Sequence, residues 1–131
     1  MSTLYAERVS DEDAIRRTIA QYCQLCDDGR FDEWADLYTD DATFSVMGKT
    51  YTGRADVKAF IEKGQAPERR GKHLCFNSII DIDGDSARAI TDYVFIDKQH
   101  AITSAGRYHD RLIRQPDRWR FAERRILFLG E

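Results

Sequence analysis

The hydrophobic periodicity of this chain changes once, near Lys72, and that change constrains the fold more than any other feature. Beyond it, four long segments combine alternating polarity with many β-branched and aromatic residues, as half-buried strands do. These segments are 73–81, 86–95, 101–114 and 119–128. Short polar turns separate them at 83–85, 97–100 and 115–118. The second part of the chain therefore predicts a sheet of long antiparallel strands.

The chain before this point has the spacing of helices. Ser10 precedes three acidic residues, which predicts an N-cap and a helix that begins near Asp11. The apolar stripe of this helix consists of Ile15, Ile19, Tyr22, Cys23 and Cys26. It ends at Asp27, Asp28 and Gly29, where we expect the helix to stop.

Two more helices are predicted before the sheet. The first is indicated by the spacing of Phe31, Trp34, Ala35 and Tyr38. Residues 39–41 are expected to end it, before an extended segment at 42–47 that turns at Gly48 and Lys49. The next helix is predicted over 53–63, with an exit loop after it. Its inward residues are expected to be Val57, Phe60 and Ile61. Helices first and antiparallel strands after predict an α+β fold.

Composition bounds the class of protein. The 131 residues suffice for a single domain, 1–131, with its own core. Apolar residues make up 42% and charged residues 33%, and the net charge of −3 argues against a nucleic-acid partner. The polar start lacks the apolar stretch of a signal peptide, and no run approaches the length of a membrane span. These features favour a cytoplasmic protein without a membrane partner.

The cysteines and acidic residues do not have the spacing of metal or disulfide sites. Cys23, Cys26 and Cys75 are an odd number and are interpreted as core residues. The cluster of Asp81, Asp83 and Asp85 lacks the distal glutamate of a calcium loop and predicts a hairpin turn. No glycine-rich phosphate loop or Gly-x-Ser-x-Gly elbow is present. We therefore expect neither a metal nor a cofactor.

Asp27 and His73 are the candidate catalytic pair. Asp27 borders the buried face of the first helix, near its C-terminal end, where a negative charge costs some tenths of a kcal/mol. A residue with such a local cost is expected to have a partner. His73, one of three histidines, opens a predicted strand. A surface carboxylate and a loop-capping histidine are the structural alternatives, whereas a paired carboxylate and imidazole would form a general base.

Short motifs along nearly the whole chain match one known family. They are DDATF at 40–44, YTG at 51–53, KH at 72–73, DGDSA at 83–87, GRYHD at 106–110, WRF at 119–121, and Arg124. In this order they resemble the SnoaL-like branch of the nuclear transport factor 2-like superfamily. The resemblance implies a cone-shaped barrel in which three N-terminal helices pack on a strongly curved, mixed, mostly antiparallel sheet.

The resemblance also implies a chemistry. The dehydratases and the hexachlorocyclohexane dehydrochlorinase of this superfamily pair an aspartate at the end of the first helix with a histidine at the start of a strand, and Asp27 and His73 occupy these positions. The histidine would remove a proton next to an activating group, and the aspartate would fix its tautomer. Cys26 and Asp97 stand where scytalone dehydratase has a tyrosine and a second histidine. These differences argue against scytalone as the substrate. Ketosteroid isomerase matches poorly, because its tyrosine and protonated acid have no equivalents here.

We expect the cavity of such a fold to hold a small, largely apolar, cyclic or aromatic molecule. Its predicted lining consists of Ile19, Tyr22, Cys26, Trp34, Phe44, Tyr51, Phe60, Cys75, Asn77 and Tyr108. Tyr22 or Arg124 is expected to steady developing negative charge, with Arg124 chosen by its position in the family. The leading prediction is therefore a cofactor-independent lyase or isomerase that performs a dehydratase-like elimination.

Two other functions remain open. A noncatalytic binding or assembly subunit, resembling the dioxygenase small subunits, would use the open face of the sheet. Epoxide hydrolysis, as in limonene epoxide hydrolase, would need an aspartate, arginine and aspartate group, but Asp110 and Arg107 lie on opposite faces of one strand. Which face lines the cavity, that of Tyr108 or that of His109, stays open.

Relatives pair through the sheet, so we expect a homodimer or homotrimer. Trp119 and Phe121 are expected to supply its apolar patch.

Overall fold

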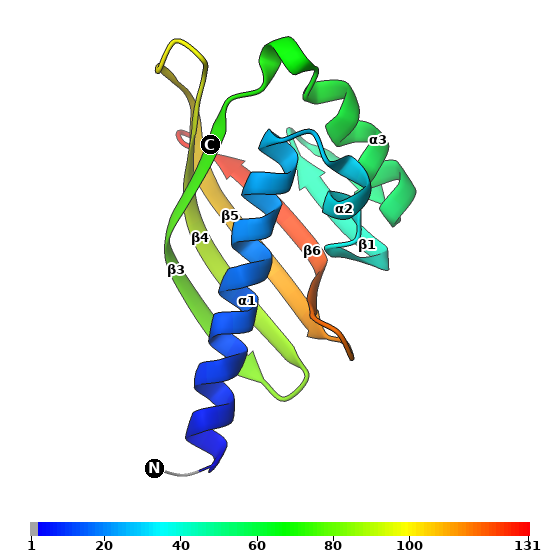
Figure 1. Ribbon diagram of the computed structural model, residues 1–131, viewed down its shortest axis with the longest axis vertical. Helices are drawn as coiled ribbons and strands as arrows, with labels where there is room; N and C mark the ends of the chain where they lie inside the picture. Colours follow the sequence, from blue (N-terminus) through cyan, green and yellow to red (C-terminus); the bar gives the residue numbers. More distant parts are fainter. Residues whose placement is uncertain (1–2) are drawn as a thin grey trace.

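Six strands form one curved sheet, and the long helix α1 crosses one face of it (Figure 1). The computed structural model describes residues 3–131; residues 1–2, part of the polar start considered above, lie outside this range. The elements are α1 (Thr3–Asp27), α2 (Phe31–Ala35), β1 (Tyr38–Val46), β2 (Lys49–Thr52), α3 (Arg54–Gly64), a short 3-10 helix (Pro67–Arg69), β3 (Lys72–Asp83), β4 (Ser86–Ile96), β5 (Ile102–Arg114) and β6 (Trp119–Phe128). The predicted α+β fold is confirmed.

The sheet has the strand order β2-β1-β6-β5-β4-β3. Strands β1 and β6 are parallel, and every other neighbouring pair is antiparallel. The four long strands of the second part follow one another as hairpins, as the short polar turns predict. The sheet curls like a cone but does not close into a barrel, since β2 and β3 are its two edges.

Two predicted boundaries are wrong. Helix α1 begins at Thr3, so Ser10 lies inside it and caps nothing. The nearby Asp11 carboxylate instead accepts two hydrogen bonds from Arg114, each 2.6 Å long, which bind the helix to the end of β5. The second helix ends at Ala35, and both Tyr38 and residues 39–41 belong to β1. An irregularity in the pairing of β1 with β6 lies at these residues and leaves Asp40 and Asp41 exposed.

The core lies between α1 and the inner face of the sheet. Its largest fully buried side chains include Tyr22, Trp34, Tyr38, Phe44, Tyr108, Leu112 and Phe121. The apolar patch expected at Trp119 and Phe121 is wrong, because both face this core and are only 2% and 0% exposed. The exposed apolar residues of the opposite face are Leu74, Phe76, Ile79, Ile90 and Leu127. Within residues 3–131, no helix is long and apolar enough to cross a membrane.

A glycine ends α1 and sets the direction of the chain beyond Asp27. Gly29 has a φ of 72°, which is costly for any residue with a Cβ. Its N–H donates to the carbonyl of Cys26, and the N–H of Arg30 donates to the carbonyl of Leu25, the paired pattern of a left-handed helix end. The guanidinium of Arg70 also occupies the space that a Cβ on Gly29 would need.

Gly29→Ala should lower the free energy of unfolding by about 1–2 kcal/mol, because alanine would have to adopt the left-handed conformation and displace Arg70. Urea denaturation measures the loss. Gly64→Ala is the matched control, since no atom lies within 4 Å of the added carbon and its φ is not in the left-handed region; this change should stay within about 0.5 kcal/mol. Equal effects at the two positions would contradict the prediction.

Candidate active site

The last residue of α1 and the second residue of β3 form the centre of the site. The Asp27 carboxylate accepts the backbone N–H of His73 at 3.2 Å (Oδ1) and 2.9 Å (Oδ2). Oδ1 also lies 2.6 Å from Nδ1 of the His73 ring. The two side chains are only 3% and 10% exposed. One carboxylate therefore binds both the backbone and the ring of the histidine.

This contact determines which tautomer the neutral imidazole adopts. With the carboxylate at Nδ1, the neutral ring carries its proton on Nδ1 and donates it to Asp27, so the lone pair of Nε2 is free. The hydrogen bonds to His73 also offset the free-energy cost of a negative charge at the C-terminal end of α1, where Asp27 lies. The ring itself packs against Phe95, with centroids 4.8 Å apart, and lies edge-on to Tyr22 at 6.1 Å.

His73 borders a cavity of about 200 Å³. Most of its lining side chains are apolar or aromatic and come from α1, α3 and the inner face of the sheet. The lining residues are Tyr22, Phe44, Val46, Met47, Phe60, Ile61, Gly64, Gln65, His73, Tyr93, Phe95, Ser104, Tyr108, Ile126 and Phe128. Of the predicted pocket residues, the structure places Tyr22, Phe44, Phe60 and Tyr108 here. The cavity is close in volume to engineered cavities of about 150 Å³ that bind benzene.

The other predicted pocket residues do not line this cavity. Ile19, Cys26 and Trp34 are 3%, 0% and 0% exposed and pack in the core, because the stripes of α1 and α2 face neighbouring elements. Tyr51 stacks on the outer side of Phe60, with ring centroids 4.2 Å apart. Cys75 contacts Cys23 under α1.

Asn77 was predicted on the wrong face of its strand. A bulge between Phe76 and Ile79 gives Asn77 a φ of 57° and places it on the surface. Its amide donates to Asp92 on β4 at 3.4 Å. The bulge adds one residue to β3, which exchanges the inward and outward positions beyond it.

Beneath the cavity, the guanidinium of Arg124 is completely buried. It makes two hydrogen bonds to the Asp110 carboxylate, at 2.7 and 2.8 Å. Although burial opposes the charged form, the Asp110 carboxylate raises the pKa of Arg124 well above its ordinary value. The guanidinium carbon lies 4.2 Å from the ring centre of Tyr22 and 3.8 Å from that of Tyr108. Arg124 therefore lies behind the cavity wall rather than in it.

The burial of Asp110 also shows which face of β5 is turned toward the interior. Asp110 is 5% exposed and Tyr108 1%, so this face of the strand lines the interior. Arg107 points the other way and pairs with Asp92 at 2.7 Å on the outer face. His109 lies on that same outer face, beside a surface hollow away from His73. The question that the sequence leaves open is thus answered in favour of Tyr108 and Asp110.

Tyr22 is positioned as a hydrogen-bond donor. Burial raises the pKa of its hydroxyl far above the ordinary value, against the opposing influence of Arg124. The phenol therefore stays protonated at neutral pH. Its ring is 1% exposed and forms part of the cavity wall beside His73.

Sequence reasoning missed three polar residues that line the cavity. Gln65, just after α3, has a buried side-chain amide oxygen, Oε1, with no hydrogen-bond partner among the described residues. The hydroxyls of Tyr93 and Ser104 lie 2.9 Å apart across β4 and β5. The inward face of β4 could have revealed Tyr93, because Tyr93 and Phe95 alternate along it, but no sequence signal marks Gln65.

A larger surface hollow lies elsewhere on the described part of the chain. It has a volume of about 640 Å³ and a polar lining on the outer side of α1 and α2 that includes Gln24, Asp28 and Arg118. His73 does not border it. Among the described residues, no three His, Cys, Asp or Glu side chains converge as metal ligands would.

Residues 7–125 match the family model of the SnoaL-like domain. The α+β fold agrees with this match. The chain belongs to the SnoaL-like domain family.

Individual relatives are distant. The uncharacterized protein Rv2910c of Mycobacterium tuberculosis (strain ATCC 25618 / H37Rv) is 25% identical over 130 residues, which cover 94% of this chain and 88% of that protein. A structure of a variant of Rv3472, a protein of unknown function from Mycobacterium tuberculosis, matches with a TM-score of 0.88 and 27% identity over 98% of this chain and 76% of that chain. A type 2 hexachlorocyclohexane dehydrochlorinase (LinA) matches with a TM-score of 0.82 and 17% identity over 95% of this chain and 88% of its own, which shows a shared fold alone.

Arg124→Met should lower the free energy of unfolding by about 3–5 kcal/mol, because it leaves the Asp110 carboxylate buried without its partner. Chemical denaturation measures this loss. Arg107→Met removes an arginine from an ion pair on the other face of the sheet, where the side chain is 55% exposed, and should cost less than about 1 kcal/mol. Similar losses in the two variants would show that the buried pair is not a stability determinant.

Proposed function

We propose that the protein is a cofactor-independent lyase or isomerase that removes a proton from a small cyclic molecule. The observation that carries this proposal is the 2.6 Å contact between Asp27 and the His73 ring beside a largely apolar cavity. An imidazole whose Nδ1 is bound to a carboxylate, and whose Nε2 is free, is suited to general-base catalysis. The fold that this chain shares with the dehydrochlorinase LinA agrees with this class of reaction.

In the proposed reaction, Nε2 of His73 takes a proton from a carbon next to an activating group of the substrate. The Asp27 carboxylate holds the ring in the required tautomer and stabilises the imidazolium that forms. Acid-base assistance of this kind contributes on the order of 10² to 10⁴ in rate. The leaving group, such as a hydroxyl, then departs with a proton from the imidazolium.

Tyr22 and Arg124 would stabilise the charge that develops on the substrate. The Tyr22 hydroxyl can donate to a carbonyl or enolate oxygen, because its raised pKa keeps it protonated. The guanidinium of Arg124 lies 4.2 Å from the ring centre of Tyr22, behind the cavity wall. Its positive charge would therefore act on Tyr22 directly and on the substrate through the electric field in the cavity. It is therefore proposed as a positioning residue, not as a ligand of the substrate.

The cavity favours a one-ring substrate with an oxygen function. A volume of about 200 Å³ fits a single ring more readily than a polycyclic molecule. The side-chain amide oxygen of Gln65 can accept a hydrogen bond from a substrate hydroxyl. The loop that carries it is tied to the β4–β5 hairpin by Lys98, whose ammonium donates to the Pro67 carbonyl at 2.8 Å.

A second candidate is an assembly or binding subunit without catalysis. The observation that favours it is the apolar outer face of the sheet, where Phe76 is 44% and Ile79 64% exposed. A homodimer or homotrimer would cover this surface in either case, and we keep such an oligomer as a proposal. The pair of Asp27 and His73 beside an apolar cavity favours the enzyme. Epoxide hydrolysis ranks last, because Arg107 and Asp110 are turned to opposite faces.

Proton abstraction can be tested without knowing the leaving group. In deuterated water, the protein should catalyse exchange of the α-protons of one-ring ketones, followed by NMR, and eliminate water from one-ring β-hydroxy ketones, followed by ultraviolet absorbance. His73→Ala should lower these rates at least about 100-fold, with a melting temperature within a few degrees. Asp27→Asn should lower them less, because it keeps the base.

The matched control for this test is His109→Ala, which removes an imidazole from the outer face of the same sheet and should leave every rate unchanged. Two results would contradict the proposal. One is exchange by the unaltered protein no faster than that of buffer across the whole panel. The other is an equal loss of rate in the His73 and His109 variants.

Gln65→Leu should remove a preference for hydroxylated ligands. The unaltered protein is expected to bind phenol more tightly than toluene, and the variant to lose about 1–3 kcal/mol of that difference, because a buried acceptor is replaced by a methyl group. Ligand-detected NMR titration gives both affinities. Gln99→Leu, in the exposed β4–β5 turn, is the control. An unchanged preference in Gln65→Leu would exclude Gln65 from recognition.

A further inference from the structure

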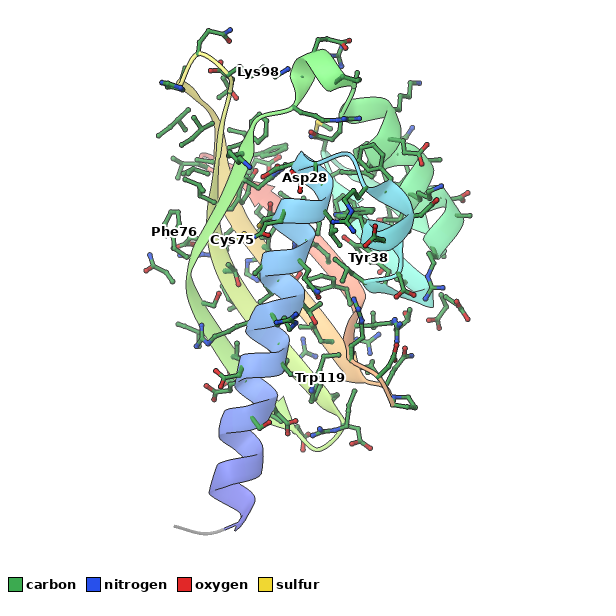
Figure 2. The ribbon with its side chains drawn as sticks, in the orientation of Figure 1. Asp28, Tyr38, Cys75, Phe76, Lys98 and Trp119 are labelled. Carbon is green, nitrogen blue, oxygen red and sulfur yellow. The ribbon has the colours of Figure 1, made fainter. Side chains whose placement is uncertain are left out.

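Two thiols outside the proposed catalytic set lie in direct contact between α1 and β3. The Sγ atoms of Cys23 and Cys75 are 3.1 Å apart, although the residues are 52 positions apart in the sequence. Figure 2 shows Cys75 between β3 and α1, with Phe76 on the opposite side of the strand. A disulfide bond requires the sulfurs at about 2.05 Å, so an approach of roughly 1 Å would complete one.

The two thiols are chemically unequal. The hydrogen bond between the two thiols lowers the pKa of Cys75, and the positive charge of Arg124 adds to this effect against the opposing influence of burial. The same bond, together with burial, raises the pKa of Cys23. Cys75 is also partly exposed, whereas Cys23 is buried. Cys75 is therefore the nucleophile of the pair, and Cys23 is the neutral thiol next to it.

The third cysteine differs from both. Cys26 is completely buried, and burial raises its pKa to about 12, so it is an inert thiol on the same helix. Cys23 and Cys26 are thus an internal comparison: one contacts Cys75 and the other does not. No such contact was expected from the sequence, which indicates three core thiols.

We propose that Cys23 and Cys75 form a redox site that hydroperoxides oxidise to a disulfide. The Cys75 sulfur attacks one oxygen of the peroxide, the O–O bond breaks, and water or an alcohol leaves with the thiol proton, which gives a sulfenic acid. The Cys23 sulfur then attacks the Cys75 sulfur, the S–S bond forms, and the hydroxyl departs as water with the Cys23 proton. The two thiols lose two electrons in total, and the peroxide gains them.

The disulfide would join the two elements that carry the proposed base. Cys23 lies one helical turn before Asp27 in α1, and Cys75 lies two residues after His73 on the same face of β3. Closure of a long loop by a covalent bond restricts the unfolded chain. We expect the oxidised protein to melt about 5–15 °C higher than the reduced protein. This inference does not depend on whether His73 is catalytic.

The test treats the full chain with a few equivalents of hydrogen peroxide, removes the excess with catalase, and alkylates all free thiols in denaturant. Mass spectrometry should show one alkylated cysteine in place of three and a bond between the tryptic peptides 18–30 and 73–88. Cys26→Ala should form the same bond, and Cys23→Ala should not, leaving a sulfenic acid on Cys75 that dimedone traps. Circular dichroism confirms that each variant is folded.

Three outcomes would overturn the proposal. The first is three alkylated cysteines after treatment of the unaltered protein, which needs no variant to fold. The second is loss of the bond in Cys26→Ala with its retention in Cys23→Ala. The third is a disulfide between two chains, visible as a dimer on a non-reducing gel. Reduction with dithiothreitol should restore three alkylated thiols and the lower melting temperature.

Discussion

A single carboxylate joins the long helix to the edge of the sheet, and much of the structure depends on this contact. Asp27 accepts hydrogen bonds from the backbone N–H and the ring of His73. The N–H belongs to an edge strand, so no strand beyond β3 could satisfy it. The carboxylate therefore holds the end of α1 against the start of β3 and orients the imidazole beside the cavity.

The second constraint is the burial of a charge. Arg124 and Asp110 are both without exposed side-chain surface, which is stable only because two hydrogen bonds pair them. Aromatic rings from Tyr22, Tyr108 and Phe121 surround the guanidinium. The cavity consequently has an apolar wall, and the guanidinium of a buried ion pair lies behind it. Such an arrangement suits a substrate that becomes negative during reaction, since charges in a dry environment interact strongly.

The interface between α1 and β3 thus carries two kinds of chemistry side by side. The carboxylate and imidazole at one end provide a candidate base, and the thiol pair one helical turn away provides a candidate redox site. Both depend on the same packing of a helix face against an edge strand. Oxidation of the thiols would make this packing covalent, so any effect on the base would come through the restricted movement of the two elements.

The sequence by itself determined the class of fold, because hydrophobic periodicity depends only on local geometry and shows where helices give way to strands. It also determined the identity of Asp27 and His73 as candidates, since a carboxylate at a helix end and a histidine at a strand start are visible as positions. It misplaced Asn77 and could not reveal Gln65, because a bulge in β3 and the approach of α3 to the sheet are tertiary events. The contacts of Cys23 with Cys75 and of Arg124 with Asp110 were likewise decided only by the tertiary structure. They join residues distant in the chain through side-chain packing, which no local pattern encodes.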